Sequence, residues 1–161
     1  MTKLKTIELS FHHAENSKEF SNEEQKLITK AQEICKNAYS PYSNFRVGAA
    51  LLLDDGTIIT GSNQENAAYP SGLCAERVAF FYASSEYPDK KVIKVAIAAR
   101  KDESTAFTPV SPCGSCRQVM LEQEERQENN IEILFQNNGG WVKLSAAEHL
   151  LPFCFDKNNL K

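Results

Sequence analysis

The strongest restriction on the fold of this chain is the order in which strand-like and helix-like segments follow one another. The apolar run 45–53 ends at Asp54-Asp55-Gly56, a hairpin-turn signal, and a returning strand is expected at 57–61. Helical and strand-like segments then alternate. The expected helices are 22–38, 74–84 and 113–125, and the expected later strands are 92–99, 131–135 and 141–144. This order predicts an α/β fold, a three-layer α-β-α sandwich with one mixed five-stranded sheet.

The first residues differ from the rest of the chain. Thr6 to Phe11 alternates polar and apolar side chains, so the N-terminal extension, residues 1–20, is expected to supply an edge strand. A chain of 161 residues has the size of one ordinary domain. We expect residues 21–161 to form this domain.

Two places show the spacing of a helix capping box. Ser21 with Glu24 is expected to start the first helix, and Ser145 with Glu148 is expected to start a short helix before Pro152.

Composition and charge argue against several kinds of partner. The net charge is -3 without a basic stripe, so we expect no nucleic-acid partner but a small-molecule substrate. Residues 1–17 lack the apolar centre of a signal peptide, and the longest apolar run, 47–53, is too short to span a bilayer. We therefore expect no membrane association and a cytoplasmic location. An odd number of cysteines in a reducing compartment argues against disulfides and favours metal binding by at least the closest pair.

The sharpest local feature is the cysteine pair in Pro112-Cys113-Gly114-Ser115-Cys116. A C-x-x-C pair brings two thiolates to one metal with little strain. The pair opens a predicted helix, where free backbone N–H groups and the helix dipole favour thiolate over thiol. By itself the pair is also compatible with a redox-active dithiol or half of a zinc site.

Cys74 and Glu76 favour a catalytic zinc. They begin a second predicted helix, and two helix starts can converge on one crevice at the strand ends of a mixed sheet. With Cys113 and Cys116, Cys74 gives three ligands and leaves a fourth position for water. Glu76 can take a proton from that water and return it to a leaving group. Arg77, one turn from Cys74, can donate to the thiolates and offset their charge.

Two plainer interpretations remain open. A closed structural zinc site needs a fourth ligand, for which Cys35, Cys154 and His149 are candidates, although none has motif spacing to the other three. Arg77 is also compatible with an ordinary surface arginine.

These residues resemble a known family. Cys74-Ala75-Glu76-Arg77 followed by Pro112-Cys113-Gly114-Ser115-Cys116-Arg117-Gln118 is similar to the small homotetrameric zinc-dependent cytidine deaminases. The resemblance extends over about residues 21–155 and includes Pro41-Tyr42-Ser43-Asn44-Phe45, Val47-Gly48-Ala49-Ala50, Asn63-Gln64-Glu65-Asn66-Ala67 and Tyr69-Pro70. It is specific, because related deaminases of nucleotides or nucleic acids usually place His where this chain has Cys74.

The resemblance implies a reaction and a set of roles. The reaction is hydrolytic deamination of free cytidine and 2'-deoxycytidine to uridine and 2'-deoxyuridine plus ammonia, in pyrimidine salvage, with one Zn²⁺ per chain. Glu76 is implied to protonate ring N3 and then the departing amine. Asn63 and Glu65 are implied to hold the ribose hydroxyl, where the carboxylate would repel a phosphate. Phe45 is implied to pack on the pyrimidine, and the Ala75 backbone to contact the base.

The resemblance also implies a homotetramer with shared active sites, in which Phe155 reaches the site of a neighbouring subunit. The sequence departs from the family pattern at Arg46, where Pro is frequent, at Ala68, where Cys is frequent, and in residues 1–20. Three other functions stay open: deamination of another aminopyrimidine nucleoside, a non-catalytic zinc module, and RNA editing, which the net charge disfavours.

Overall fold

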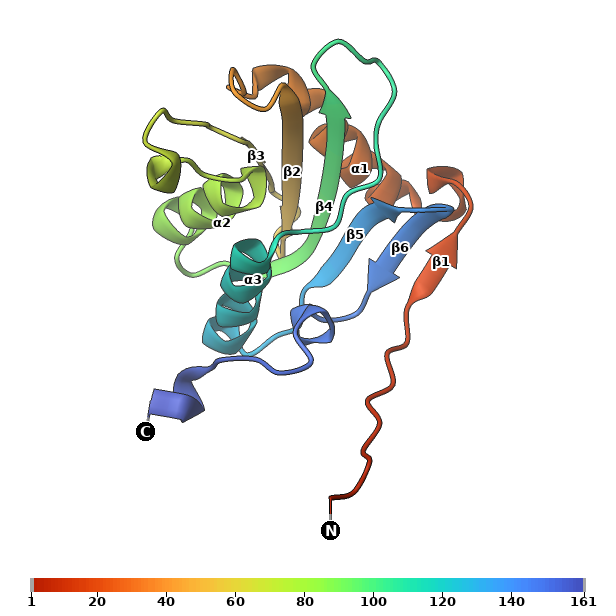
Figure 1. Ribbon diagram of the computed structural model, residues 1–161, viewed down its shortest axis with the longest axis vertical. Helices are drawn as coiled ribbons and strands as arrows, with labels where there is room; N and C mark the ends of the chain where they lie inside the picture. Colours follow the sequence, from red (N-terminus) through yellow and green to blue (C-terminus); the bar gives the residue numbers. More distant parts are fainter. Residues whose placement is uncertain (1, 161) are drawn as a thin grey trace.

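The computed structural model describes residues 2–160, and within them one six-stranded sheet has the order β1-β6-β5-β4-β2-β3 (Figure 1). The strands are β1 (His12–Ala14), β2 (Phe45–Leu53), β3 (Ile58–Ser62), β4 (Val92–Lys101), β5 (Glu132–Asn137) and β6 (Gly140–Leu144). β4 and β5 pair in parallel, and the other neighbours pair antiparallel. The mixed sheet is confirmed, with one strand more than the five expected.

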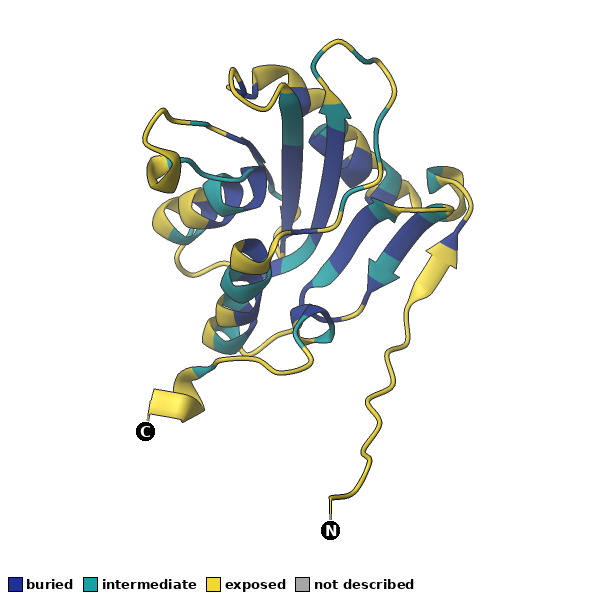
Figure 2. Cartoon of the chain, viewed as in Figure 1, coloured by how far each residue is buried: buried dark blue, intermediate teal, exposed yellow. Residues whose placement is uncertain are grey.

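Helices cover both faces of this sheet. α1 (Asn22–Ile34) packs on one face with Ala50 and Leu52 of β2. α2 (Ala75–Glu86) and α3 (Gly114–Gln127) pack on the other face with Leu51 and Leu53. Because successive side chains of a strand point to opposite faces, the run of buried residues in β2 supplies both cores, and Figure 2 shows the central strands as the buried layer. The three-layer α-β-α sandwich is confirmed.

Among residues 2–160, five short 3₁₀ helices lie outside the α-helices and strands: η1 (Ser17–Glu19), η2 (Cys35–Asn37), η3 (Tyr69–Ser71), η4 (Ala147–Leu150) and η5 (Lys157–Leu160). In the range that the structure describes, no helix combines the length and the apolar character needed to cross a bilayer.

Two glycines allow helices to lie close to the sheet. A Cβ atom on Gly48 would lie 2.1 Å from the carbonyl oxygen of Ala31 in α1, and one on Gly61 would lie 2.5 Å from the carbonyl oxygen of Ala75 in α2. Any side chain at these positions would push the helix away. The absence of a side chain at Gly61 therefore lets the first turn of α2 lie directly against β3.

The strand directions bring two helix starts to one edge of the sheet. β2 runs antiparallel to both of its neighbours, β3 and β4, so its first residue lies beside their carboxyl ends. α2 follows β3 and α3 follows β4 in the chain. Both helices consequently begin at this edge, as the sequence predicted.

Two local predictions were wrong. The edge strand is not Thr6 to Phe11 but β1, the next residues along the chain, because β6 ends at Leu144, which limits how far a strand can pair with it. Residues 2–11 form an exposed extended arm, here called the N-terminal arm (Figure 2). Ser145 does not cap the short helix η4, which begins after Ala146 without a side-chain cap.

Candidate active site

A pocket of about 760 Å³ opens at the edge of the sheet where α2 and α3 begin. Its wall combines polar and apolar side chains from β2, β4, both helix starts and the connections between these elements. The sequence-predicted residues that line it are Phe45, Asn63, Glu65, Cys74, Glu76, Arg77 and Cys113.

Three cysteines meet where α2 and α3 begin, and two of them, Cys74 and Cys113, line the pocket. Cys74 is the N-cap residue of α2, and Cys113 is the N-cap residue of α3. The Sγ atoms of Cys74 and Cys113 are 3.7 Å apart, and those of Cys113 and Cys116 are 3.5 Å apart. All three Sγ atoms lie within 4.8 Å of one another. Thiolates bound tetrahedrally to zinc at about 2.3 Å are themselves about 3.8 Å apart, so these spacings fit one zinc ion.

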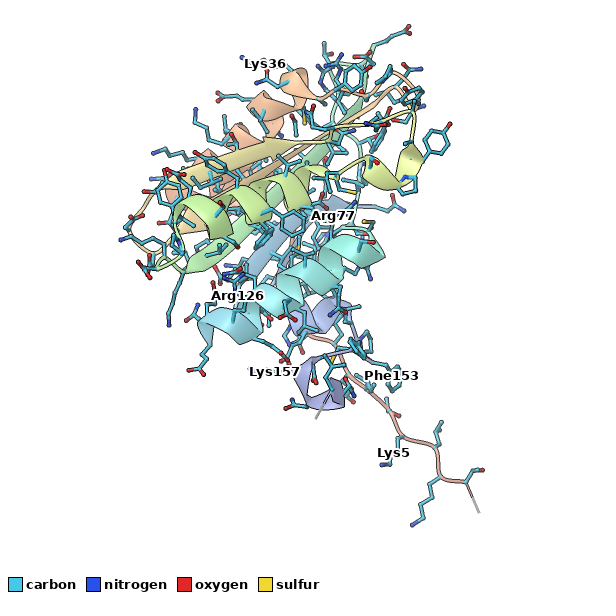
Figure 3. The ribbon with its side chains drawn as sticks, turned by 90° about the vertical axis from the view of Figure 1, so that its left-hand side faces the viewer. Lys5, Lys36, Arg77, Arg126, Phe153 and Lys157 are labelled. Carbon is cyan, nitrogen blue, oxygen red and sulfur yellow. The ribbon has the colours of Figure 1, made fainter. Side chains whose placement is uncertain are left out.

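The surroundings of Cys74 favour a thiolate. Hydrogen bonds with Cys116, Arg77 and Cys113 and the positive charge of Arg77 together lower the pKa of Cys74 to about 5 against the opposing effect of burial. The same interaction with Cys74, together with burial, raises the pKa of Cys116. Nη2 of Arg77 lies 3.8 Å from Sγ of Cys74. Figure 3 shows Arg77 between the first turns of α2 and α3. Arg77 thus belongs to the site and is not an ordinary surface arginine.

Glu76 is the buried acid of the site. It is the second residue of α2, lines the pocket and is only 4% exposed. Burial raises the pKa of its carboxyl, and the negative charge of Cys74 adds to this effect. A carboxyl with a raised pKa at the wall of a pocket is suited to exchanging protons near neutral pH.

Asn63 and Glu65 are held in place by backbone groups of the pocket wall. Oδ1 of Asn63 accepts from the Val47 N–H at 2.7 Å, and its Nδ2 donates to the Phe45 carbonyl at 3.0 Å. Glu65 accepts from the Tyr42 N–H at 2.9 Å and from the Ser43 hydroxyl at 2.5 Å. The hydrogen bond from Ser43 is the main cause of a lowered pKa for Glu65, which keeps this carboxylate ionised.

Three sequence-predicted residues are not among those that line the pocket of their own chain: Cys116, which is fully buried behind Cys74 and Cys113, Ala75 and Phe155. The side chain of Ala75, the first residue of α2, is buried in the core. Phe155 is 58% exposed in the C-terminal segment, where its carbonyl accepts from Nε2 of Gln118 at 2.7 Å. Its neighbour Phe153 lies well away from Arg77 in Figure 3.

Sequence reasoning did not assign several residues of the wall: Tyr42, Ser43, Val47, Tyr69, Leu73, Ile97, Val110 and Ser111. Tyr42, Ser43, Val47 and Tyr69 stand within the motifs that carried the family resemblance, so a signal existed for them. Ile97 and Val110 enter the wall through strand and loop geometry, and no motif marks them.

Fold and site together define a zinc-binding α/β protein in which three clustered thiols lie near a buried acid. Residues 21–128 match the family model described as the cytidine and deoxycytidylate deaminase zinc-binding region. The chain belongs to the cytidine deaminase family, as the relatives also show.

A cytidine deaminase of Halalkalibacterium halodurans is 48% identical over 136 residues, covering 84% of this chain and 96% of the relative. One of Sporosarcina psychrophila is 40% identical over 136 residues, covering 84% of this chain and 93% of the relative. Among solved structures, the cytidine deaminase of Burkholderia pseudomallei matches with a TM-score of 0.67 and 38% identity, covering 81% of this chain and 97% of that chain.

Proposed function

We propose that this protein hydrolyses free cytidine and 2'-deoxycytidine to uridine and 2'-deoxyuridine plus ammonia. The observation that carries the proposal is a cluster of three thiols at zinc-compatible spacing, two of which line one pocket together with the buried Glu76. The pocket volume of about 760 Å³ is in the range of small-molecule sites, which suits a nucleoside. Such an enzyme acts in pyrimidine salvage, and we place it in the cytoplasm.

Cys74, Cys113 and Cys116 are the proposed zinc ligands, with one ion per chain. The chemistry that zinc supplies when bound is acidification of a water molecule, so that the water can add to a ring carbon at neutral pH. Arg77 donates toward the thiol of Cys74 and offsets the negative charge of three thiolates.

Glu76 is the proposed proton carrier. Its carboxylate takes the proton of the attacking water and delivers it to ring N3. A second proton passes through the same carboxyl to the exocyclic amine, which leaves as ammonia while the carbonyl of uridine forms. The burial of Glu76 supports this role, because it raises the pKa and so favours both uptake and release of a proton near pH 7.

The remaining wall is the proposed nucleoside-binding surface. Phe45 packs on the pyrimidine, and the Ala75 backbone, at the free N-terminus of α2, contacts the base. Asn63 and Glu65 hold the ribose. The ionised Glu65 disfavours a phosphate at that point, which supports a free nucleoside over a nucleotide.

We further propose a homotetramer in which Phe155 of one subunit completes the pocket of a neighbour. The exposure of Phe155 and its absence from the pocket wall of its own chain support this role. Residues 21–161 form the catalytic domain in this proposal, and residues 1–20 are an extension to it.

The test is an ultraviolet assay on cytidine and deoxycytidine, with and without a zinc chelator, on the unaltered protein and on Glu76→Gln. The amide of Gln has the shape of Glu but cannot carry the proton, so we expect kcat to fall by about 1,000-fold with one zinc still bound per chain. Glu86→Gln, an exposed change at the end of α2, is the matched control and should leave turnover unchanged. Turnover that survives both chelation and Glu76→Gln would refute the mechanism.

A further inference from the structure

Arg46 stands out because its side chain joins three separate parts of the chain. Its Nε forms an ion pair with Asp102, which directly follows β4. Its Nη1 donates to the carbonyl of Lys36 in η2 at 2.8 Å and to the carbonyl of Ala38 at 3.2 Å. The side chain is only 22% exposed. A planar guanidinium can serve several acceptors at once, which no other side chain does as well.

Arg46 lies behind the wall of the pocket rather than in it. Phe45 and Arg46 are consecutive residues of β2, so their side chains point to opposite faces of the sheet. Phe45 lines the pocket, whereas Arg46 bonds to η2, which follows α1 on the other face. Arg46 therefore does not line the pocket, although its backbone is joined directly to that of Phe45.

Phe45 borders a second cavity in addition to the pocket. A separate cavity of about 570 Å³ is lined by residues 43–45 and 101–104. Phe45 is thus not fixed by close apolar packing all round, and packing would otherwise be the usual means of fixing an aromatic ring. Its neighbour Asn44 adopts a φ of 52°, a left-handed conformation that the surroundings must hold.

Polar contacts fix this part of β2. The Phe45 carbonyl accepts from Asn63, and the Asn44 carbonyl accepts from the Asp102 N–H at 2.8 Å. Arg46 is paired in register with Arg100 on β4, and like charges on paired strands repel one another. Asp102 offsets this repulsion. Its carboxylate pairs with Arg46, and its backbone carbonyl accepts a hydrogen bond from Arg100 at 3.1 Å.

We propose that Arg46 is a positioning residue that, with Asp102, holds Phe45 in the orientation that packs on the pyrimidine. This inference rests on the proposed role of Phe45 in substrate binding. It gives a physical role to a residue at which the chain departs from the frequent Pro of the family. A proline fixes the backbone by its own ring, whereas Arg46 fixes it by bonds to neighbouring segments.

The experiment measures KM and kcat for cytidine on Arg46→Gln, Asp102→Asn, Phe45→Ala and the double variant of Arg46→Gln with Phe45→Ala. We expect Arg46→Gln to raise KM about tenfold with kcat within about twofold, the pattern of lost uniform binding. Asp102→Asn should raise KM in the same direction, and Arg46→Lys, which can still pair with Asp102, should recover part of the loss. Lys30→Gln, which breaks an exposed ion pair on α1, removes the same charge and should change neither constant.

The double variant tests the route of the effect. Arg46→Gln should change KM by less than about twofold when Phe45 is already Ala, because it acts through that ring. Full additivity of the two changes in KM in the double variant would overturn the proposal. An unchanged KM for Arg46→Gln would overturn it too, and so would a fall in kcat for Arg46→Gln that parallels a fall in its zinc content. If Phe45→Ala leaves KM unchanged, the proposed role of Phe45 fails and the positioning role fails with it. If Phe45→Ala raises KM but Arg46→Gln does not, only the positioning role is refuted, and the proposed role of Phe45 stands.

Discussion

Glu65 illustrates how single residues of the pocket are oriented before a substrate arrives. The N–H groups of Tyr42 and Ser43 and the Ser43 hydroxyl all donate to its carboxylate. Three donors on one carboxylate fix its orientation and keep it charged, since each donor stabilises the ionised form. Glu65 can therefore present a lone pair to a sugar hydroxyl without a further loss of side-chain entropy on binding.

Replacing Glu65 with Gln tests this orientation. An amide NH₂ group would face donors that need an acceptor, so we expect Gln to lose at least one of these hydrogen bonds. KM for cytidine should rise about tenfold with little change in kcat, while the discrimination against cytidine 5'-phosphate should weaken. Initial-rate measurements on both substrates check this, with Glu8→Gln in the exposed N-terminal arm as the charge-matched control. An unchanged KM would mean that the carboxylate does not contact the substrate.

The sequence predicted single residues unevenly. The cysteines and Glu76 were predictable because metal spacing and helix starts are local properties of the sequence. The two hydrogen bonds between the Asn63 amide and the β2 backbone were not predictable, since they depend on the pairing of β2 with β3. The place of Phe155 depends on chain segments far apart in sequence and was assigned only through the family resemblance.

At the scale of elements, an ionic cluster around the buried Glu24 joins α1 to the sheet. Glu24, in the first turn of α1, is 4% exposed and pairs with Lys143 of β6 at 2.9 Å and with Lys94 of β4 at 3.6 Å. Lys94 also pairs with Glu132 at 2.5 Å and with Glu23 at 3.6 Å. Burial alone would raise the pKa of Glu24, but hydrogen bonds from Lys143 and Ser21 lower it from 4.5 to about 2.

This lowered pKa predicts a dependence of stability on pH. The folded chain binds a proton at Glu24 less readily than the unfolded chain, so the stabilisation is complete above pH 4.5 and is lost as the pH falls toward about 2. It amounts to about 3 kcal/mol. Denaturant titrations should show Glu24→Gln less stable than the unaltered protein at pH 7, with the difference shrinking below pH 4.5. Glu23→Gln, on the same turn but exposed, should lower the free energy of unfolding far less. A stability difference for Glu24→Gln that does not change with pH would contradict the prediction.

Capping shows what a local pattern can and cannot predict about elements. The Ser21 and Glu24 box forms as expected, because both partners lie in one helical turn. The same spacing at Ser145 gives no cap, because η4 begins one residue later, after Ala146. At that start, Glu124 of α3 accepts from the Ala147 N–H at 2.7 Å, and this partner is 23 residues away in sequence, so no short window could reveal it.

At the scale of the whole molecule, the N-terminal segment divides into two parts. The N-terminal arm is fully exposed, whereas β1 extends the sheet and buries Ala14. Phe20 then packs edge-to-face on Trp141 of β6, with ring centroids 6.4 Å apart. The sequence predicted an extension with an edge strand, but its position depended on where β6 ends, which alternation alone does not specify.

Two truncations separate these parts. A chain that lacks residues 2–10 should keep its melting temperature within about 1 °C, because it loses only exposed side chains. A chain that lacks residues 2–20 also loses β1 and the contact with Trp141, and should melt about 5–10 °C lower, while it retains zinc and turnover. Calorimetry and the cytidine assay measure both. Equal melting temperatures for the two truncations would show that β1 adds nothing to stability.

The two helix starts that hold the cysteines have one more consequence. The ligands Cys74 and Cys113 are 39 positions apart, so an ion bound by both acts as a cross-link that closes a long loop of the chain. Such a closure lowers the entropy of the unfolded chain in the way a disulfide does, yet it needs no oxidising compartment. It also spans α2, β4 and the start of α3, so the ion fastens the two helices of one layer to each other. A zinc ion held by these cysteines would thus serve the proposed reaction and also stabilise the fold as a reversible cross-link.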